Sequence, residues 1–132
     1  MISYRQLLKQ AIDARKQAYC PYSGFAVGAA LLCKDGSIYK GCNIENASYS
    51  PTNCAERTAF FKALSEGKRD FVAIAIVGGD NDLQWCYPCG VCRQVMAEFC
   101  EDDFEVVCGI SEEEYEVLRL GELTPKTFRL KN

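Results

Sequence analysis

Histidine is absent from this sequence of 132 residues, and its absence removes several kinds of active site. Without imidazole there is no serine–histidine–aspartate triad, no histidine general base and no zinc site with a histidine ligand. The sequence also lacks a run of about 20 apolar residues that could cross a bilayer, and it lacks an amino-terminal charged segment followed by an apolar one. We therefore expect a cytoplasmic protein with no membrane partner.

Positive charge is also in short supply. The 15 lysines and arginines are outnumbered by 18 aspartates and glutamates, which leaves a formal net charge of -3. Proteins that bind long nucleic acids attract the phosphates with a basic surface, so we expect no nucleic acid partner. The 48% hydrophobic and 25% charged residues are typical of a globular protein, and the length predicts a single domain over residues 1–132.

Cysteine, by contrast, is plentiful. The sequence has 9 cysteines, an odd number, and no recognisable secretion signal. We therefore expect reduced thiols rather than a disulfide framework, and clustered thiols become candidates for metal binding or catalysis. Because histidine is missing, any metal ion must be bound by thiolates or carboxylates.

Hydrophobic spacing predicts helices that alternate with strands. Ser3 is a suitable N-cap for the first helix, and Thr52 or Asn53 for the second. Three helices are expected, at residues 4–18, from 52 or 53 to 64, and from after Pro88 to about Cys100. Five strands are expected, at residues 27–33, 38–43, 71–77, 105–109 and 115–120.

The order of these elements predicts the fold class. The first two strands are joined by Asp35-Gly36, a pair that tolerates the positive φ of hairpin turns. The third strand is apolar at consecutive positions, which is typical of a strand covered on both faces. We predict an α/β protein, a three-layer α/β/α sandwich with a mixed sheet of about five strands.

The sequence Pro88-Cys-Gly-Val-Cys92 contains a pair of cysteines at a predicted helix start. Cys89 and Cys92 are three residues apart, so their sulfurs lie on one face within one turn and can bind one metal ion. A redox dithiol shares this spacing, but it predicts a strand that leads directly into the motif. Here a loop with Trp85 and Tyr87 intervenes, which favours metal binding.

A second motif, Cys54-Ala-Glu56, lies at the start of another predicted helix. Taken alone, it is compatible with a buried cysteine followed by a surface glutamate. Together with Cys89 and Cys92, however, Cys54 provides a third thiolate and leaves the fourth tetrahedral position for water, as in catalytic zinc sites. Glu56 would then be placed to accept a proton from that water.

Two further residues bear on this metal site. Arg57 follows Glu56 and could donate hydrogen bonds to the thiolates, which would offset their negative charge. Cys86 could instead complete a four-cysteine structural zinc site, and this interpretation stays open. An iron–sulfur cluster would require a cysteine where Met96 stands.

Cys54-Ala-Glu56 together with Pro88-Cys-Gly-Val-Cys-Arg-Gln94 resembles the small, homotetrameric, three-cysteine type of cytidine deaminase. A glutamate two residues after the first ligand and a later P-C-x-x-C mark zinc nucleobase deaminases, the class that includes this family. Residues 20–30 resemble its first strand, and residues 41–49 resemble its ribose-binding strand. The resemblance covers nearly the whole chain, from the first helix to Phe128.

The resemblance implies zinc-dependent hydrolytic deamination of cytidine and 2′-deoxycytidine to uridine and 2′-deoxyuridine, with release of ammonia, in pyrimidine salvage. One Zn²⁺ per chain would be bound by Cys54, Cys89 and Cys92. Glu56 would move a proton from zinc-bound water to N3 of the base and then to the leaving amine.

The resemblance also implies the contacts to a nucleoside substrate. Asn43 and Glu45 would hold the ribose hydroxyls, the ring of Phe25 would pack against the pyrimidine, and the backbone of Ala55 would contact the base. An amide and a carboxylate two residues apart on a strand share one face, which suits a ribose that offers both donors and acceptors.

Assembly is implied by the resemblance alone. Members of the family form homotetramers whose pockets are completed by neighbouring chains, and the matching positions are Tyr49 and Phe128. Two related activities compete with cytidine deamination. A blasticidin-type deaminase shares the zinc core, but Asn43-Ile-Glu45 favours the nucleoside, and a net charge of -3 argues against an RNA or DNA deaminase.

Overall fold

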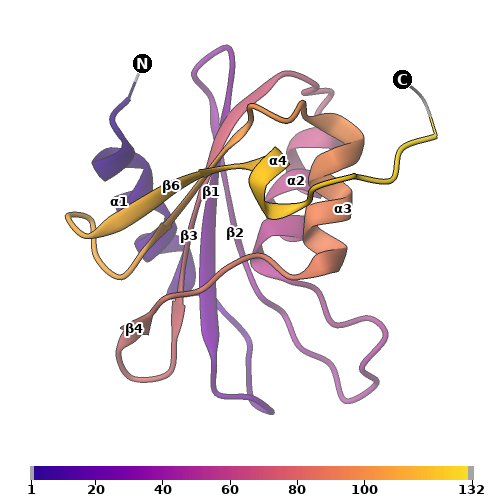
Figure 1. Ribbon diagram of the computed structural model, residues 1–132. Coiled ribbons are helices and arrows are strands. Elements are labelled where there is room, and N and C mark those ends of the chain that lie inside the picture. The colour runs from indigo at the N-terminus through magenta and orange to yellow at the C-terminus, as the bar shows by residue number, and fades with distance from the viewer. Residues whose placement is uncertain (1, 131–132) are drawn as a thin grey trace.

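The computed structural model describes residues 2–130, which form an open sheet covered by helices (Figure 1). No helix in this part of the chain has the length and apolar character needed to cross a membrane. The helices are α1 (Tyr4–Arg15), α2 (Ala55–Ser65), α3 (Gly90–Phe99) and α4 (Leu120–Leu123). The strands are β1 (Ala26–Cys33), β2 (Ile38–Cys42), β3 (Phe71–Gly79), β4 (Leu83–Gln84), β5 (Glu105–Gly109) and β6 (Tyr115–Arg119).

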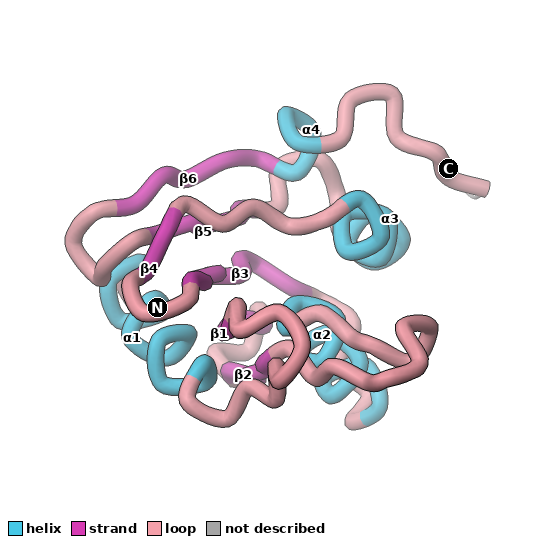
Figure 2. The backbone as a smooth tube through the Cα atoms, turned by 90° about the horizontal axis from the view of Figure 1, so that it is seen from below, coloured by secondary structure: helices cyan, strands magenta, loops and turns pink. Residues whose placement is uncertain are grey.

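The strands form one mixed sheet in the order β2-β1-β3-β5-β6, and β4 pairs with the end of β3. β3 and β5 are parallel, and the other neighbouring strands are antiparallel. Figure 2 shows the sheet between α1 on one side and α2 and α3 on the other. The predicted three-layer α/β/α sandwich with a mixed sheet is confirmed, with β4 as a sixth, two-residue strand.

The sheet has a hydrophobic core on each face, as the apolar run of the central strand predicts. Along β3, Ala73, Ala75 and Val77 pack toward α1, while Ile74 and Ile76 pack toward α2 and α3. All five side chains are buried. Because successive residues of a strand point to opposite faces, a strand covered on both faces needs apolar residues at every position.

The β1–β2 hairpin turns where the sequence predicts. Gly36 has a φ of 92°, a value that residues with a Cβ rarely adopt. The carboxylate of Asp35 accepts hydrogen bonds from the backbone N–H and the hydroxyl of Ser37, at 3.0 and 2.6 Å. The turn sets the register that pairs Leu32 with Ile38.

The first helix is shorter than expected. Ser3 is its N-cap, as predicted, and forms a capping box with Gln6. α1 ends at Arg15, however, and does not continue to residue 18. The N–H groups of Gln17 and Ala18 bond to carbonyls three residues back, both at 3.1 Å, so the last turn tightens and leaves the α-helix.

The second helix begins later than either predicted N-cap allows. Its N-cap is Cys54, one residue after Asn53 and two after Thr52. The backbone of Asn53 exchanges two hydrogen bonds of 2.9 Å with Ile44, and the hydroxyl of Thr52 accepts the N–H of Asn46 at 3.1 Å. Both candidate residues therefore form hydrogen bonds with residues 44–46, and neither caps the helix.

The third helix lies where expected, and the end of one strand differs. α3 runs from Gly90 to Phe99, after Pro88 and close to the predicted end near Cys100. β3 continues to Gly79 because Gly78 and Gly79 pair with β4. α4 was not expected, since four residues are too few to produce a helical pattern.

Two glycines allow helices to lie directly on the sheet. A Cβ at Gly41 in β2 would lie 2.4 Å from the carbonyl oxygen of Ala55 and 2.5 Å from the nitrogen of Ala59, both in α2. A Cβ at Gly28 in β1 would lie 2.1 Å from the carbonyl oxygen of Ala11 in α1. Gly41 thus fixes how closely the first turn of α2 approaches the sheet.

Candidate active site

Three cysteines meet where two helices begin. Cys54 is the N-cap of α2, Cys89 is the N-cap of α3, and Cys92 lies in the first turn of α3. The Sγ of Cys89 accepts the N–H of Cys92 at 3.5 Å, which takes the place of the usual oxygen cap. The positive ends of two helix dipoles therefore face the sulfurs and favour their thiolate form.

The spacing of the sulfurs fits a tetrahedral metal ion. The Sγ atoms of Cys54 and Cys89 are 3.8 Å apart, and the Sγ atoms of all three cysteines lie within 4.8 Å of one another. Zinc binds thiolates at about 2.3 Å, which places two sulfurs of a tetrahedron about 3.8 Å apart. The cysteines thus provide three soft ligands at the spacing that zinc requires.

Cys86 does not join this cluster. Among the described residues, the group of possible ligands comprises Cys54, Cys89 and Cys92 alone. Cys86 lies against Gly78, where its Sγ is 2.9 Å from the position that a Cβ would take. Burial raises the pKa of the Cys86 thiol to about 11, so this thiol stays protonated near neutral pH. The geometry therefore favours a three-cysteine site with an open fourth position over a four-cysteine structural site.

Arg57 places a positive charge beside the cluster. Its Nη2 donates a hydrogen bond to the Sγ of Cys54 at 3.3 Å. Hydrogen bonds, first from the Cys92 thiol and then from Arg57, lower the pKa of Cys54, although burial acts in the opposite direction. In the described chain, the Nε of Arg57 is buried without a hydrogen-bond partner. A half-buried cation with an unsatisfied donor suits a site that gathers several thiolate charges.

Among the described residues, Glu56 is the one buried acidic residue. It lies in the first turn of α2 and is only 4% exposed. Burial, with a smaller effect of the negative charge of Cys54, raises the pKa of its carboxyl group to about 7. A carboxyl group with such a pKa can both accept and donate a proton near neutral pH.

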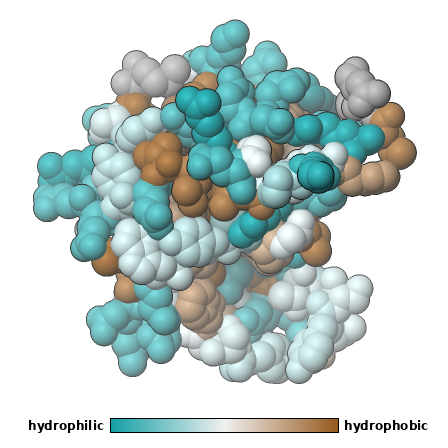
Figure 3. Space-filling model, in the orientation of Figure 1, coloured by the Kyte–Doolittle hydropathy of each residue, from teal (hydrophilic) through white to brown (hydrophobic). Residues whose placement is uncertain are grey.

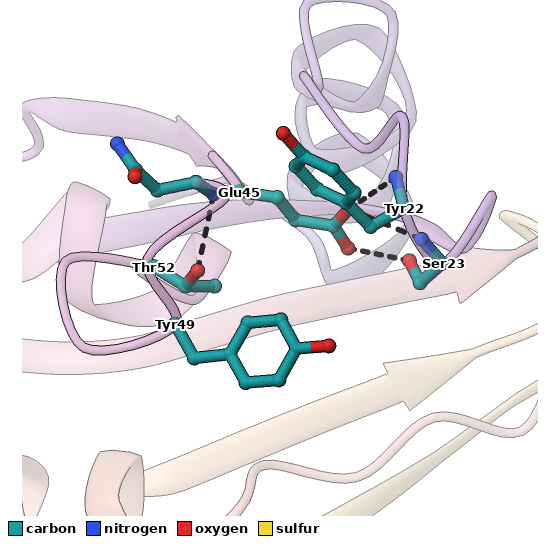
Figure 4. A pocket seen from close by; sticks show the side chains of 6 residues that line it. Tyr22, Ser23, Glu45, Tyr49 and Thr52 are labelled. Atoms are coloured by element: carbon teal, nitrogen blue, oxygen red, sulfur yellow. Dashed lines mark hydrogen bonds between the residues drawn. The ribbon is translucent and has the colours of Figure 1, made fainter.

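A cavity of about 350 Å³ lies beside the ends of β1 and β2. It is lined by Tyr22, Ser23, Glu45, Asn46, Tyr49 and Thr52. Figure 4 shows the Glu45 carboxylate pointing toward the loop at residues 22–23. Glu45 accepts the N–H groups of Tyr22 and Ser23 at 3.0 and 3.1 Å, and the hydroxyl of Ser23 at 2.5 Å.

Asn43 connects the same loop to the sheet. Its Nδ2 donates to the carbonyl of Phe25 at 2.8 Å, and its Oδ1 accepts the N–H of Val27 at 2.9 Å. Phe25 is half-buried, with its ring 3.0 Å from the position of a Cβ at Gly78. Asn43 and Glu45 therefore hold the segment that carries Phe25, in addition to any role toward a ligand.

The remaining predicted residues occupy contrasting positions. Ala55 is fully buried in the first turn of α2, between Cys54 and Glu56. Tyr49 is 83% exposed at the rim of the cavity. Phe128 is 66% exposed and does not belong to the cavity lining. The structure thus brings the cysteines, Glu56 and Arg57 together and leaves Phe128 apart from them.

Sequence reasoning missed two residues that organise the site. Ser23 ties the loop to Glu45, as described above. Arg93 follows the candidate ligand Cys92, and its guanidinium donates to the carbonyls of Pro88 and Leu123, at 2.7 and 2.5 Å. Its place next to a ligand cysteine in the first turn of α3 is the one signal in the sequence that could have indicated Arg93.

Comparison with known proteins agrees with this geometry. A family model described as the cytidine and deoxycytidylate deaminase zinc-binding region matches residues 1–110. A cytidine deaminase from Halalkalibacterium halodurans is 56% identical over 124 residues, which span 94% of this chain and 92% of that protein. This chain belongs to the cytidine and deoxycytidylate deaminase family.

Solved structures support membership of the family. The crystal structure of a cytidine deaminase from Burkholderia pseudomallei superposes with a TM-score of 0.89 at 46% identity, covering 96% of this chain and 100% of that one. A blasticidin-S deaminase from Bacillus cereus is 33% identical over 87 residues, 61% of this chain and 62% of that protein. The likeness to the cytidine deaminases is therefore both closer and more extensive.

Proposed function

We propose that this chain catalyses the zinc-dependent hydrolysis of cytidine and 2′-deoxycytidine to uridine and 2′-deoxyuridine, with release of ammonia, a reaction of pyrimidine salvage. The observation that carries the proposal is the cluster of three cysteine sulfurs at tetrahedral spacing, with the buried carboxyl group of Glu56 on the adjoining turn. Sequence identity of 56% to a cytidine deaminase supports the choice of substrate.

Cys54, Cys89 and Cys92 are proposed to hold one zinc ion per chain. Zinc in such a site acts as a Lewis acid, which lowers the pKa of water and so provides a nucleophile at neutral pH. Glu56 takes one proton from the attacking water and gives it to N3 of the base. It then takes the second proton from the hydroxyl group added to the ring and gives it to the departing amine, which leaves the carbonyl group of uridine and ammonia. Burial favours this role, because a carboxyl group shielded from solvent has a pKa closer to neutrality.

Arg57 is proposed to compensate the charge of the three thiolates. Three thiolates give the site more negative charge than neutral imidazole ligands would, and this charge opposes the acidification of water. The hydrogen bond from Arg57 to Cys54 withdraws part of that charge. The amino-terminal ends of α2 and α3 act in the same sense.

The nucleoside is proposed to bind with its ribose at the end of β2. The amide of Asn43 would donate to and accept from the ribose hydroxyls, and the carboxylate of Glu45 would accept from them. Phe25 would pack against the pyrimidine, and the backbone of Ala55 would contact the base. The cavity lined in part by Glu45 and Tyr49 supports this placement, since it adjoins the loop at residues 22–23 that Glu45 holds.

The chain is further proposed to work as a homotetramer in the cytoplasm, with Tyr49 and Phe128 completing the pockets of neighbouring chains. Exposed apolar side chains on α2 and α3 support assembly, because Phe61 is 46% exposed and Val91 is 57% exposed. All 9 cysteines are free thiols, which suits a reducing compartment.

The deaminase proposal is tested by incubating purified, zinc-assayed protein with cytidine and measuring uridine and ammonia. We expect turnover in the parent protein and its loss in Glu56→Gln, which keeps the size of the side chain but removes its acid–base function. The zinc content of both proteins must be equal for the loss to be assigned to proton transfer. Absence of turnover in a parent protein that holds about one zinc per chain would refute cytidine as the substrate.

A further inference from the structure

Gly78 in β3 is the point where three side chains from different parts of the chain meet. A Cβ placed there would lie 2.9 Å from the Sγ of Cys86, 3.0 Å from the Cε2 of Phe25 and 3.1 Å from the Cγ2 of Val27. Ordinary contacts of a Cβ begin at 3.4 Å. The three side chains therefore fill the space that a side chain at position 78 would need, and we call this arrangement the Gly78 contact.

The backbone of Gly78 is held by the sheet on both sides. It pairs with Val27 in β1 and with Gln84 in β4. Because successive residues of a strand point to opposite faces, position 78 faces the same side as Ile74 and Ile76, the side of α2 and α3. The Gly78 contact therefore has a rigid support, on the face of the sheet where the candidate metal ligands lie.

Cys86 reaches the Gly78 contact from the segment between β4 and α3. This segment crosses the end of β3 on its way to Cys89, the N-cap of α3 (Figure 1). In Figure 3, the hydrophilic turn between β3 and β4 lies at the lower left, the paler loop after β2 lies at the lower right, and apolar atoms are visible between them. Cys86 is half-buried and packs against the core under α2 and α3. The segment that leads to two candidate metal ligands thus lies beside the ring of Phe25.

Phe25 reaches the Gly78 contact from the loop before β1. Its backbone is fixed, because its carbonyl accepts a hydrogen bond from Asn43 at 2.8 Å. An aromatic side chain still turns about two bonds, so the atoms that flank the ring decide where it lies. Sulfur makes favourable contacts with the edge of an aromatic ring, and the Sγ of Cys86 and the Cε2 of Phe25 flank the same point above Gly78.

We propose that Cys86 is a positioning residue, which holds the ring of Phe25 against the pyrimidine of a bound nucleoside and relies on the missing side chain of Gly78 to do so. The inference rests on the proposed deaminase function and on the proposed role of Phe25. Cys86 acts through the ring and not on the substrate. A smaller side chain at position 86 leaves the ring without support, and a larger one at position 78 pushes the ring away from the sheet.

The first test removes the sulfur. Cys86→Ala should raise the KM for cytidine about fivefold, within the strength of a sulfur–aromatic contact. Because packing on the ring stabilises the ground state and the transition state alike, kcat should change less than about twofold, and zinc content should not change. Cys33→Ala is the matched control, since Cys33 is a buried thiol at the end of β1 far from Phe25. It should lower the melting temperature and keep the KM of the parent protein.

The second test asks whether Cys86 acts through the ring. Gly78→Ala should raise the KM about tenfold, because the new methyl group overpacks the contact. Adding Cys86→Ala to Gly78→Ala frees the space of the sulfur for that methyl group, so the KM of the double variant should be lower than that of Gly78→Ala alone. In Phe25→Leu, which has no ring to hold, adding Cys86→Ala should leave the KM unchanged.

The outcomes separate the two proposals. A parent protein without turnover refutes the deaminase function, and the positioning role is refuted with it. With turnover intact, an unchanged KM in Cys86→Ala overturns the positioning role alone. A rise in KM that is equally large in the Phe25→Leu background also overturns it, since Cys86 would then act by another route. Melting curves show which variants are folded, and Cys86→Ser makes the same comparison with a smaller atom if Cys86→Ala is unfolded.

Discussion

Gly41→Ala should damage the active site through the position of a helix. The new Cβ would lie 2.4 Å from the carbonyl oxygen of Ala55, and an ordinary contact is at least 3.4 Å, so the first turn of α2 must move by about 1 Å. That turn carries Glu56 and begins at Cys54. Displacing a catalytic constellation by this distance costs about 100-fold in activity, and overpacking costs about 1–3 kcal/mol in the free energy of unfolding.

Gly28→Ala provides the matched control. Its Cβ would lie 2.1 Å from the carbonyl of Ala11, so it displaces α1 to a similar degree, but α1 carries none of the proposed site residues. Both variants should lose stability in urea unfolding, whereas only Gly41→Ala should lose most of its kcat/KM for cytidine and release zinc faster to a chelator. Equal losses of activity in the two variants, or full activity in Gly41→Ala, would refute the reasoning.

Three further outcomes are expected. Cys86→Ser should retain about one zinc per chain, and loss of the metal would restore the four-cysteine interpretation. Arg57→Gln should release zinc to a chelator about 10 to 100 times faster, as is typical of lost hydrogen bonds to metal ligands; an unchanged rate would contradict charge compensation. The Ser23 hydroxyl holds the pKa of Glu45 below its ordinary 4.5, so the loop is anchored above that pH and released as pH falls through the lower, folded pKa. Limited proteolysis within residues 20–25 should therefore accelerate in acid, but not in Glu45→Gln.

Much of the fold was predictable because the pattern of a strand reflects what covers it. The apolar run at residues 71–77 has no polar position, which requires helices on both faces, and β3 has them. The start of α2 was not predictable in the same way. Asn53 has the chemistry of an N-cap, but its backbone is paired with Ile44, nine positions earlier, and no local preference indicates that pairing.

The candidate site shows the same division. Cys54, Cys89 and Cys92 could be selected from the sequence because all three lie at predicted helix starts. In addition, a chain without histidine offers few other side chains that can bind a metal ion. Contacts between distant segments could not be selected. Ser23 lies 22 residues from Glu45, and Gln94 lies 34 residues from Phe128. Such contacts depend on how the chain folds back on itself, which the spacing of neighbouring residues does not encode.

The meeting of two helix starts at one cluster of sulfurs gives the metal centre a structural role of its own. Cys54 and Cys89 are 35 residues apart, so an ion bound by both closes a loop of that length. A covalent cross-link closing such a loop removes conformational entropy from the unfolded chain worth about 4 kcal/mol. The described cysteines of this chain are all free thiols. A metal ion bound by Cys54 and Cys89 would therefore cross-link the starts of α2 and α3 and stabilise the fold, as a disulfide does in proteins of oxidising compartments.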